Sequence, residues 1–179
     1  MTEPGNTDLR YPIGPFEYRA PTTAADRGAW IETIARTPGK LRAAVAGLDP
    51  GQLDTAYRPG GWTVRQVAHH VPDSHMNAYI RCKLALTEDH PTIKPYFEAR
   101  WAELPDSARP IDGALALLDL LHERWVALLR ATPEAAFART LYHPEAKIDF
   151  TLDRLVAMYA WHGPHHTAHV TELRRRQGW

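Results

Sequence analysis

Histidine is the residue type whose number and spacing in this chain most directly suggest chemistry. Ten histidines are present, and seven of them fall within residues 69–75 and 162–169. Neutral imidazole is the commonest metal ligand in proteins, and a local excess of histidine is a compositional sign of metal binding. We therefore predict a metal site built from some of these seven side chains, which are His69, His70, His75, His162, His165, His166 and His169.

Helix geometry separates the histidines of the second segment. At about 100° per residue, His162 and His166 lie within about 40° of each other and face the apolar stripe of the helix expected there. A four-residue spacing places two imidazoles one turn apart, within reach of a single ion. His165 points about a quarter-circle away, and His169 lies at the edge of the stripe. Because a low dielectric and the exclusion of water strengthen coordination, we predict that His162 and His166 are ligands.

The third ligand must come from another helix, and His70 is the best-placed candidate. It borders an apolar stripe on the helix expected after Thr63, and several polar side chains project from nearly the same side. A polar row beside an apolar stripe is typical of a pocket wall. The candidates for lining this pocket or supporting the ligands are Gln66, Asp73, Asn77 and Arg81. Asp73 is close enough to orient the imidazole of His70, although a solvated carboxylate on the helix surface is an equally good interpretation.

The remaining reactive side chains are interpreted as structural. His75, His90, His122 and His143 are assigned to the surface or to packing. Cys82 lies on an apolar stripe and is assigned to the core, as a small hydrophobic residue rather than a nucleophile. The sequence identifies no general base or other catalytic residue.

The composition describes one soluble globular domain and argues against several classes of partner. The chain has 179 residues, is 44% hydrophobic, and carries 21 Lys+Arg against 21 Asp+Glu. A net charge of +0 gives no long-range field for recruiting nucleic acid or anionic lipid. The single cysteine cannot form an internal disulfide, the first residues lack the segments of a signal peptide, and no apolar run is long enough to span a membrane. We expect a cytoplasmic protein that binds a small-molecule substrate, and neither nucleic acid nor membrane.

The chain divides into an N-terminal arm and one helical domain. Four prolines fall within residues 1–25, which predicts an extended arm packed on the domain. Residues 26–179 are expected to form a single metal-binding domain of four amphipathic helices, because apolar residues recur at steps of three and four. The helices are predicted to begin near Asp26, after Thr63, at Asp112 and after Thr151, with the second and third ending near Glu88 and Thr132.

Prolines and irregular segments complicate this bundle. Pro38-Gly39 is expected to kink or split the first helix, whereas the apolar stripe stays in phase across Pro164, which predicts a kinked but continuous last helix. Residues 134–150 are expected to be irregular, without a strand of useful length. The prediction is an all-α four-helix bundle, and the long connections after the second and third helices argue against simple up-down order.

Several motifs resemble those of the DinB/YfiT group of four-helix metalloproteins, and specifically its YfiT branch, whose members are named as metal-dependent hydrolases. The likeness covers nearly the whole chain. The motifs that carry it are Tyr11-Pro-Ile-Gly14, Gly60-Gly-Trp-Thr-Val-Arg-Gln-Val, His69-His70, Asp73-Ser-His-Met-Asn77, Tyr142-His-Pro144, Trp161-His162 and Gly178-Trp179. A match of this length is far more specific than a pattern of three histidines.

The resemblance implies a ligand set, an assembly and a fold. The group's metal is held by one histidine on the second helix and a four-spaced pair on the last, which correspond to His70, His162 and His166 in this chain. The resemblance also implies a homodimer and a DinB/YfiT-like bundle with long crossover connections. The chain departs from the group's pattern at Pro72 and at Gly163-Pro164, which bears on the spacing of the ligands.

A site of three neutral imidazoles leaves a divalent ion at least one open position, as in catalytic zinc sites. Such ligands suit several metals, of which zinc is our first expectation and nickel the second. Water bound to such an ion has its pKa lowered towards about 7, and a bound thiol is deprotonated. The first hypothesis is a metal-dependent hydrolase that activates water. The alternatives are an S-transferase that joins a low-molecular-weight thiol of the bacillithiol or mycothiol type to an electrophile, and a non-catalytic metal-binding sensor.

Overall fold

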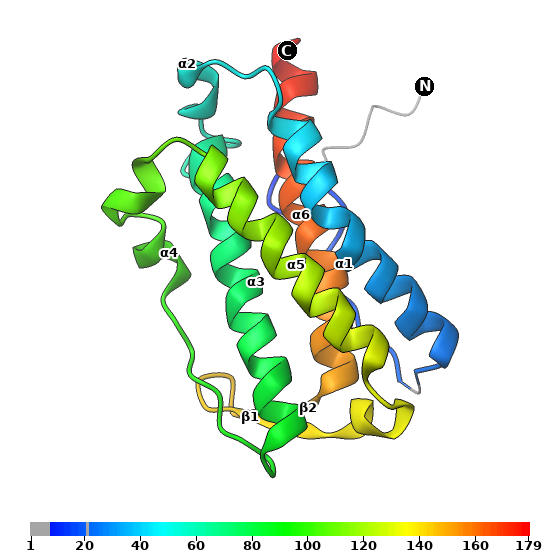
Figure 1. The fold of residues 1–179 in the computed structure, drawn as a ribbon. Coiled ribbons are helices and arrows are strands. Elements are labelled where there is room, and N and C mark those ends of the chain that lie inside the picture. The colour runs from blue at the N-terminus through cyan, green and yellow to red at the C-terminus, as the bar shows by residue number, and fades with distance from the viewer. Residues whose placement is uncertain (1–7, 21) are drawn as a thin grey trace.

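Four long helices form a bundle in which consecutive helices are not all neighbours. The computed structural model describes residues 8–20 and 22–179. Its long helices are α1 (Ala24–Val45), α3 (Val64–Thr87), α5 (Asp112–Ala131) and α6 (Leu152–Gln177). α1 packs against α5 and α6, and α3 packs against the same two helices (Figure 1). α1 and α3 therefore occupy opposite corners, which confirms the predicted all-α bundle with crossover connections.

Polar side chains mark where the long helices begin. The Thr63 hydroxyl accepts a hydrogen bond from the backbone N–H of Gln66, and the Gln66 side chain accepts one from the backbone of Thr63. This reciprocal capping box at the start of α3 is the one that the sequence predicts. Thr151 caps α6 as expected, and a further capping box joins Thr23 to Asp26 at the start of α1. These caps satisfy N–H groups that have no partner within the helix.

Three of the long helices continue through an internal proline. Pro38 lies inside α1, Pro72 inside α3 and Pro164 inside α6. The continuity of the last helix is confirmed. Of the two outcomes expected at Pro38-Gly39, a kink or a split, the split does not occur, because α1 is one continuous helix. Ile34 and Leu41, which lie about one turn to either side, are completely buried and hold both halves of α1 against the core.

A small β-hairpin occupies the segment that the sequence describes as irregular. β1 (Thr140–His143) pairs antiparallel with β2 (Ile148–Thr151), and a 3₁₀ turn over Glu134–Ala138 precedes it. Each strand buries one side chain, Leu141 in β1 and Phe150 in β2. A single buried residue per strand gives no alternation of apolar and polar residues from which a strand could be predicted. The remaining short elements lie in the connections and are α2 (Pro50–Leu53), α4 (Glu98–Trp101) and a 3₁₀ turn over Pro105–Ala108.

The apolar core consists of two clusters with a polar layer between them. One cluster includes Ile34, Ala78, Cys82, Trp125, Leu155 and Tyr159. The other includes Leu41, Val67, Val71, Leu118, Val170 and Leu173. The layer between them contains Thr37 of α1, Ser74 and His75 of α3, His122 of α5 and the histidines within residues 162–169 of α6. Polar groups that are buried between two apolar clusters need hydrogen-bond partners or a ligand.

The described part of the N-terminal arm lies along α6. The indole N–H of Trp161 donates to the carbonyl oxygen of Gly14 at 3.1 Å. The Nε2–H of His169 donates to the carbonyl oxygen of Arg10 at 3.2 Å. Residues 1–7 and 21 of the predicted arm lie outside the described residues. The predicted absence of a signal peptide concerns the first of these residues.

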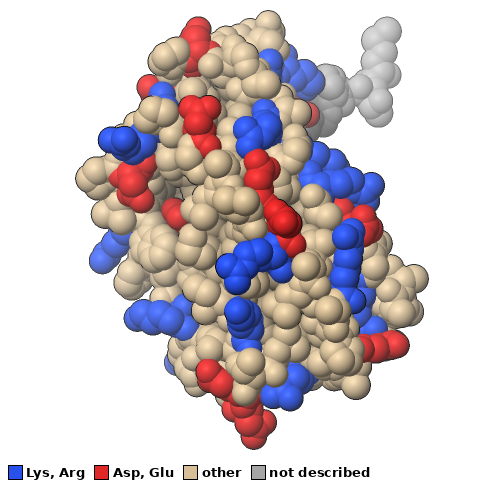
Figure 2. Space-filling model, in the orientation of Figure 1, with Lys and Arg blue, Asp and Glu red and all other residues tan. Residues whose placement is uncertain are grey.

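The surface carries charges of both signs. On the face shown in Figure 2, basic and acidic side chains are interspersed rather than gathered by sign. Among the residues that the structure describes, no helix combines the length and the apolar character needed to cross a membrane.

Candidate metal centre

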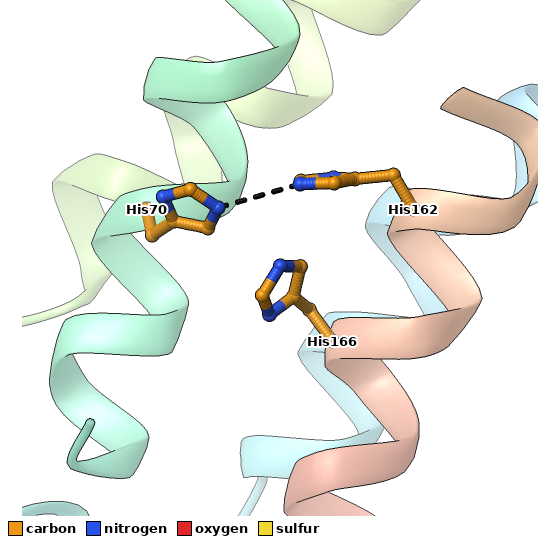
Figure 3. Close-up of side chains that lie close together, drawn as sticks. All are labelled: His70, His162 and His166. Carbon is orange, nitrogen blue, oxygen red and sulfur yellow. Dashed lines mark hydrogen bonds between the residues drawn. The ribbon is translucent and has the colours of Figure 1, made fainter. Parts of the chain in front are cut away.

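Three histidines from two adjacent helices converge on one point. His70 comes from α3, and His162 and His166 come from successive turns of α6 (Figure 3). One ring nitrogen from each residue lies within 4.8 Å of the other two. The Nε2 atoms of His70 and His162 are 3.3 Å apart. The structure thus brings together the three residues that the sequence nominates as ligands.

The spacing and chemistry of these donors fit a small divalent ion. Two imidazole nitrogens bound to one zinc at about 2.0–2.1 Å in tetrahedral geometry lie about 3.3 Å apart. The Nε2 atoms of His70 and His162 have this separation, 3.3 Å. Imidazole is also a donor that zinc and nickel accept readily. The triad therefore fits such an ion in its donor chemistry and in the separation of this pair.

The electrostatic surroundings keep the triad in the form that binds metals. Burial lowers the pKa of His70 to about 3. Burial, together with the neighbouring imidazoles, lowers the pKa values of His162 and His166 well below the ordinary value. Desolvation disfavours the imidazolium cation, so all three rings are neutral near pH 7. Neutral imidazole has the free lone pair that coordination requires.

The triad borders a cavity whose wall includes the ring of Trp62 and several polar side chains. The ring of Trp62, which precedes α3, lies 4.5 Å from that of His70 and 6.1 Å from that of His166, measured between centroids. The cavity has a volume of about 650 Å³. Besides the three histidines, its wall includes the polar side chains of Arg10, Arg58, Ser74, Arg81, Tyr96, Glu98 and Glu145. A small molecule can therefore reach the point on which the imidazoles converge.

Of the four side chains proposed to line the pocket or support the ligands, only Arg81 lines this cavity. Gln66 is used at the helix start, and its amide donates to the carbonyl oxygen of Ala102. Asn77 donates to the carbonyl oxygen of Asp73, one turn earlier in α3. Asp73 lines a different cavity together with His69. Around the axis of α3, Ser74 and Arg81 lie on the side of His70 that faces the cavity, whereas Gln66, Asp73 and Asn77 lie on its other side.

His165 and His169 are more buried than helix phase indicates. Their exposed fractions are 6% and 3%. The His165 ring stacks on Trp161 at 4.2 Å between centroids, and the His169 ring stacks on Tyr57 at 4.0 Å. The arm and these aromatic rings cover the side of α6 beyond its apolar stripe. Both histidines line the cavity, but neither belongs to the converging triad.

Three histidines that the sequence assigns to the surface or to packing belong to the site, and one of them, His143, lines the cavity. His75 and His122 are 0% and 2% exposed, and their rings are hydrogen-bonded to each other. His75 is also bonded to His162. The signal was available, because each lies in phase with an apolar stripe: His75 with Val71, and His122 with Leu118. A buried histidine on such a stripe needs a polar partner.

The chain is similar in sequence to curated proteins of two Bacillus species, and in both sequence and fold to a solved structure from a third. A protein of Bacillus cereus (strain B4264), named "Putative metal-dependent hydrolase", is 56% identical over 96% of this chain and 99% of its own length. One of the same name from Bacillus thuringiensis subsp. konkukian (strain 97-27) is 55% identical over the same shares. YfiT from Bacillus subtilis is described as "a probable metal-dependent hydrolase with an unusual four-helix bundle topology". It matches this structure with a TM-score of 0.93 and 50% identity, over 96% of this chain and 98% of its own.

The fold and the triad together define a helical-bundle protein with a buried cluster of three histidines between its helices. The sequence pattern of the DinB superfamily matches residues 33–170. The chain belongs to the DinB superfamily, and the resemblance to its YfiT branch is confirmed by both sequence and fold.

Proposed function

We propose that this protein is a metal-dependent hydrolase whose divalent ion, zinc first and nickel second, is held by His70, His162 and His166. The observation that carries the proposal is the approach of three neutral ring nitrogens, from the buried His70 and His166 and the half-buried His162, to within 4.8 Å of one another beside an open cavity. A divalent ion held by three imidazoles supplies Lewis-acid chemistry, which lowers the pKa of a water or thiol that it binds. The names of the relatives support the same class of reaction.

Other side chains in the cavity have roles that follow from their surroundings. Burial raises the pKa of the Tyr96 hydroxyl, so this group stays protonated and can donate a hydrogen bond to a substrate. The Arg81 guanidinium donates to the carbonyl oxygen of Lys94 at 3.1 Å, which holds it at the cavity wall, where it can bind a carbonyl or anionic oxygen. Ser74 lies between the hydroxyl of Tyr159 and the ring of His162, at 3.3 and 3.4 Å.

A protein nucleophile is not part of this proposal. Cys82 lies in the apolar cluster, is completely buried, and its thiol pKa is raised to about 12 by that burial. The indole N–H of Trp125 also donates to its sulfur at 3.3 Å. Because the thiolate is the nucleophilic form, Cys82 is unreactive near neutral pH, and the nucleophile must enter through the cavity.

The charge of the cavity supports a second candidate, transfer of a low-molecular-weight thiol to an electrophile. Arg10, Arg58 and Arg81 line the cavity against two carboxylates, Glu98 and Glu145. This excess of positive charge favours an anionic cofactor or substrate, as an acidic thiol of the bacillithiol type would be. The third candidate, a non-catalytic sensor, needs no cavity beside its ion, and the cavity therefore argues against it.

Turnover assays distinguish these candidates. Zinc-loaded protein is incubated with p-nitrophenyl acetate, with and without added bacillithiol or mycothiol, and the His166→Ala variant provides the background. The proposal predicts cleavage of the ester without thiol, lost in His166→Ala. Product formed only when thiol is present would support the transferase instead. Wild-type rates equal to those of His166→Ala under both conditions would contradict both enzymatic functions and would favour the non-catalytic metal-binding sensor.

A further inference from the structure

A chain of hydrogen bonds connects the candidate ligand His162, through His75 and His122, to a backbone carbonyl of α1. The Nδ1 atom of His122 lies 2.8 Å from the carbonyl oxygen of Ile34. The Nε2 atom of His122 lies 2.8 Å from Nδ1 of His75, and Nε2 of His75 lies 3.1 Å from Nδ1 of His162. The four residues come from α1, α5, α3 and α6 in turn. The chain therefore includes one group from every long helix.

The direction of every hydrogen bond follows from its first member. A carbonyl oxygen can only accept, so His122 must carry its proton on Nδ1 and donate it to Ile34. A neutral imidazole has one donor and one acceptor nitrogen, so Nε2 of His122 accepts from Nδ1–H of His75. By the same step, Nε2 of His75 accepts from Nδ1–H of His162. The Nε2 atom of His162 then carries the ring's lone pair as an acceptor, and it lies 3.3 Å from Nε2 of His70 and 3.4 Å from the hydroxyl of Ser74.

We propose that His75 and His122 are positioning residues that hold His162 in its Nδ1–H tautomer and so present its Nε2 lone pair to the metal. The inference rests on the proposed metal site but adds two residues to it that do not touch the ion. Ligating histidines in proteins commonly donate their second ring nitrogen to a carboxylate or a backbone carbonyl. Here two further imidazoles separate the ligand from the carbonyl that fixes the direction.

Packing makes this arrangement specific. His75 and His122 lie in the polar layer between the two apolar clusters and are almost completely buried. The Trp125 ring meets both imidazoles edge-on, at 5.7 Å between centroids in each case. The hydrogen-bond partners of the two rings are each other, His162 and a backbone carbonyl, and include no carboxylate that could offset a buried positive charge. Buried rings in such surroundings favour the neutral form, and for neutral rings the direction of the chain is unique.

The tautomer can be measured directly in the metal-free protein. Two-bond ¹H–¹⁵N correlation spectra of histidine side chains distinguish the Nδ1–H from the Nε2–H form. The proposal predicts the Nδ1–H form for His162, His75 and His122 at pH 7.5, with His162 assigned by its loss in His162→Gln. The Nε2–H form at His162 would overturn the proposal, whatever the protein does to a substrate.

A matched pair of variants tests the effect on metal binding. His122→Leu removes the acceptor for His75, whereas His122→Gln can accept from His75 and donate to Ile34. We expect His122→Leu to weaken zinc binding by about 10- to 100-fold, the range found for groups that orient ligands. His122→Gln should remain within about threefold of the wild type, and His69→Leu serves as a control outside the chain. Equal zinc affinities in His122→Leu and His122→Gln would contradict the proposal.

The failure of this inference is distinguishable from the failure of the proposed function. Zinc affinity is measured by competition with a chromogenic chelator and needs no substrate. If the wild type binds no zinc, the proposed function fails, and the tautomer spectra still decide whether the chain of histidines fixes His162. If His122→Leu does not fold, the wild-type spectra alone carry the test.

Discussion

The side chain of Thr37 in α1 lies directly against the bare Cα of Gly163 in α6. A Cβ atom added to Gly163 would lie 2.5 Å from Cγ2 of Thr37 and 2.6 Å from its Oγ1. Thr37 is 1% exposed, and its hydroxyl donates to the carbonyl oxygen of Thr33 at 3.1 Å, so it cannot easily move aside. The contact sets how closely α1 and α6 approach immediately beside His162.

We expect Gly163→Ala to lower the free energy of unfolding by about 1–3 kcal/mol, the cost of overpacking a rigid core. Alanine favours a helix over glycine by about 1 kcal/mol, but the overlap with Thr37 outweighs that gain. Thr37→Ala removes both close atoms, so the double variant should recover most of the loss. Urea unfolding of the four proteins measures the coupling, and strictly additive changes would show that the two side chains do not collide.

The three ligands can be tested by metal retention. His166→Ala removes one of the converging imidazoles, and we expect it to lose zinc on dialysis. His165→Ala removes an adjacent buried imidazole outside the triad and should retain one zinc per chain. Elemental analysis after dialysis provides the measurement. Equal zinc contents in the two variants would contradict the assignment of the triad.

Metal binding should also raise thermal stability, because the ion binds the folded protein. At a free zinc concentration of about 100 times the dissociation constant, the gain is about 2.7 kcal/mol. For a chain of this size, that gain corresponds to a rise in Tm of about 5–11 °C. A chelator should reverse the shift. His70→Ala should melt at the same temperature with and without zinc, and a shift of wild-type size in that variant would show that zinc binds elsewhere.

The fold could be predicted from the sequence where helix caps and apolar periodicity agree with the way the helices pack. The apolar period of α3 and the Thr63 capping box both point to the same helix start. Of the kink or split expected at Pro38-Gly39, the split does not occur, because the core contacts of Ile34 and Leu41, which local sequence does not show, hold both halves of the helix in place. The hairpin is not predicted because each of its strands buries only one side chain, which leaves no alternation of apolar and polar residues. Backbone pairing between residues 140–143 and 148–151 forms the strands instead.

The site was accessible only in part, for a related reason. The four-residue spacing identifies His162 and His166 because both lie on one helix. The partnership of His75 with His122 depends on how α3 meets α5, which no periodicity within either helix encodes. The burial of His165 likewise depends on the ring of Trp161 and on the N-terminal arm. The sequence therefore predicts the pairing of His70 with His162 and His166, but not the other contacts between elements that complete the site.

The buried histidines predict that the metal-free protein loses stability in mild acid. Burial lowers the pKa of His122 to about 4, whereas an unfolded histidine titrates near 6.5. Below about pH 6.5 the unfolded chain therefore binds more protons than the folded one, and the free energy of unfolding falls as the pH falls. Each such histidine contributes up to about 1.4 kcal/mol per pH unit.

Urea unfolding in the presence of EDTA between pH 7.5 and 5.5 measures this slope above the range in which most carboxylates titrate. His122→Gln removes one contributor and should show a shallower slope than the wild type. A wild-type stability that is constant or rises as the pH falls across this range would contradict the burial of neutral imidazoles.

The ion pair between Arg27 and Asp153 anchors the start of α6 to α1. A second ion pair of Arg27, with Glu134, serves as the control for a test of the first. Nε and Nη2 of Arg27 donate to the two carboxylate oxygens of Asp153 at 2.6 and 3.2 Å, and the side chains are only 14% and 11% exposed. Arg27 also pairs with Glu134, whose side chain is 73% exposed. Asp153→Ala leaves a guanidinium with little solvent and should cost about 3 kcal/mol. Glu134→Ala should cost less than about 1 kcal/mol, because water screens that pair. Equal losses of unfolding free energy in the two variants would show that burial does not determine the strength of these interactions.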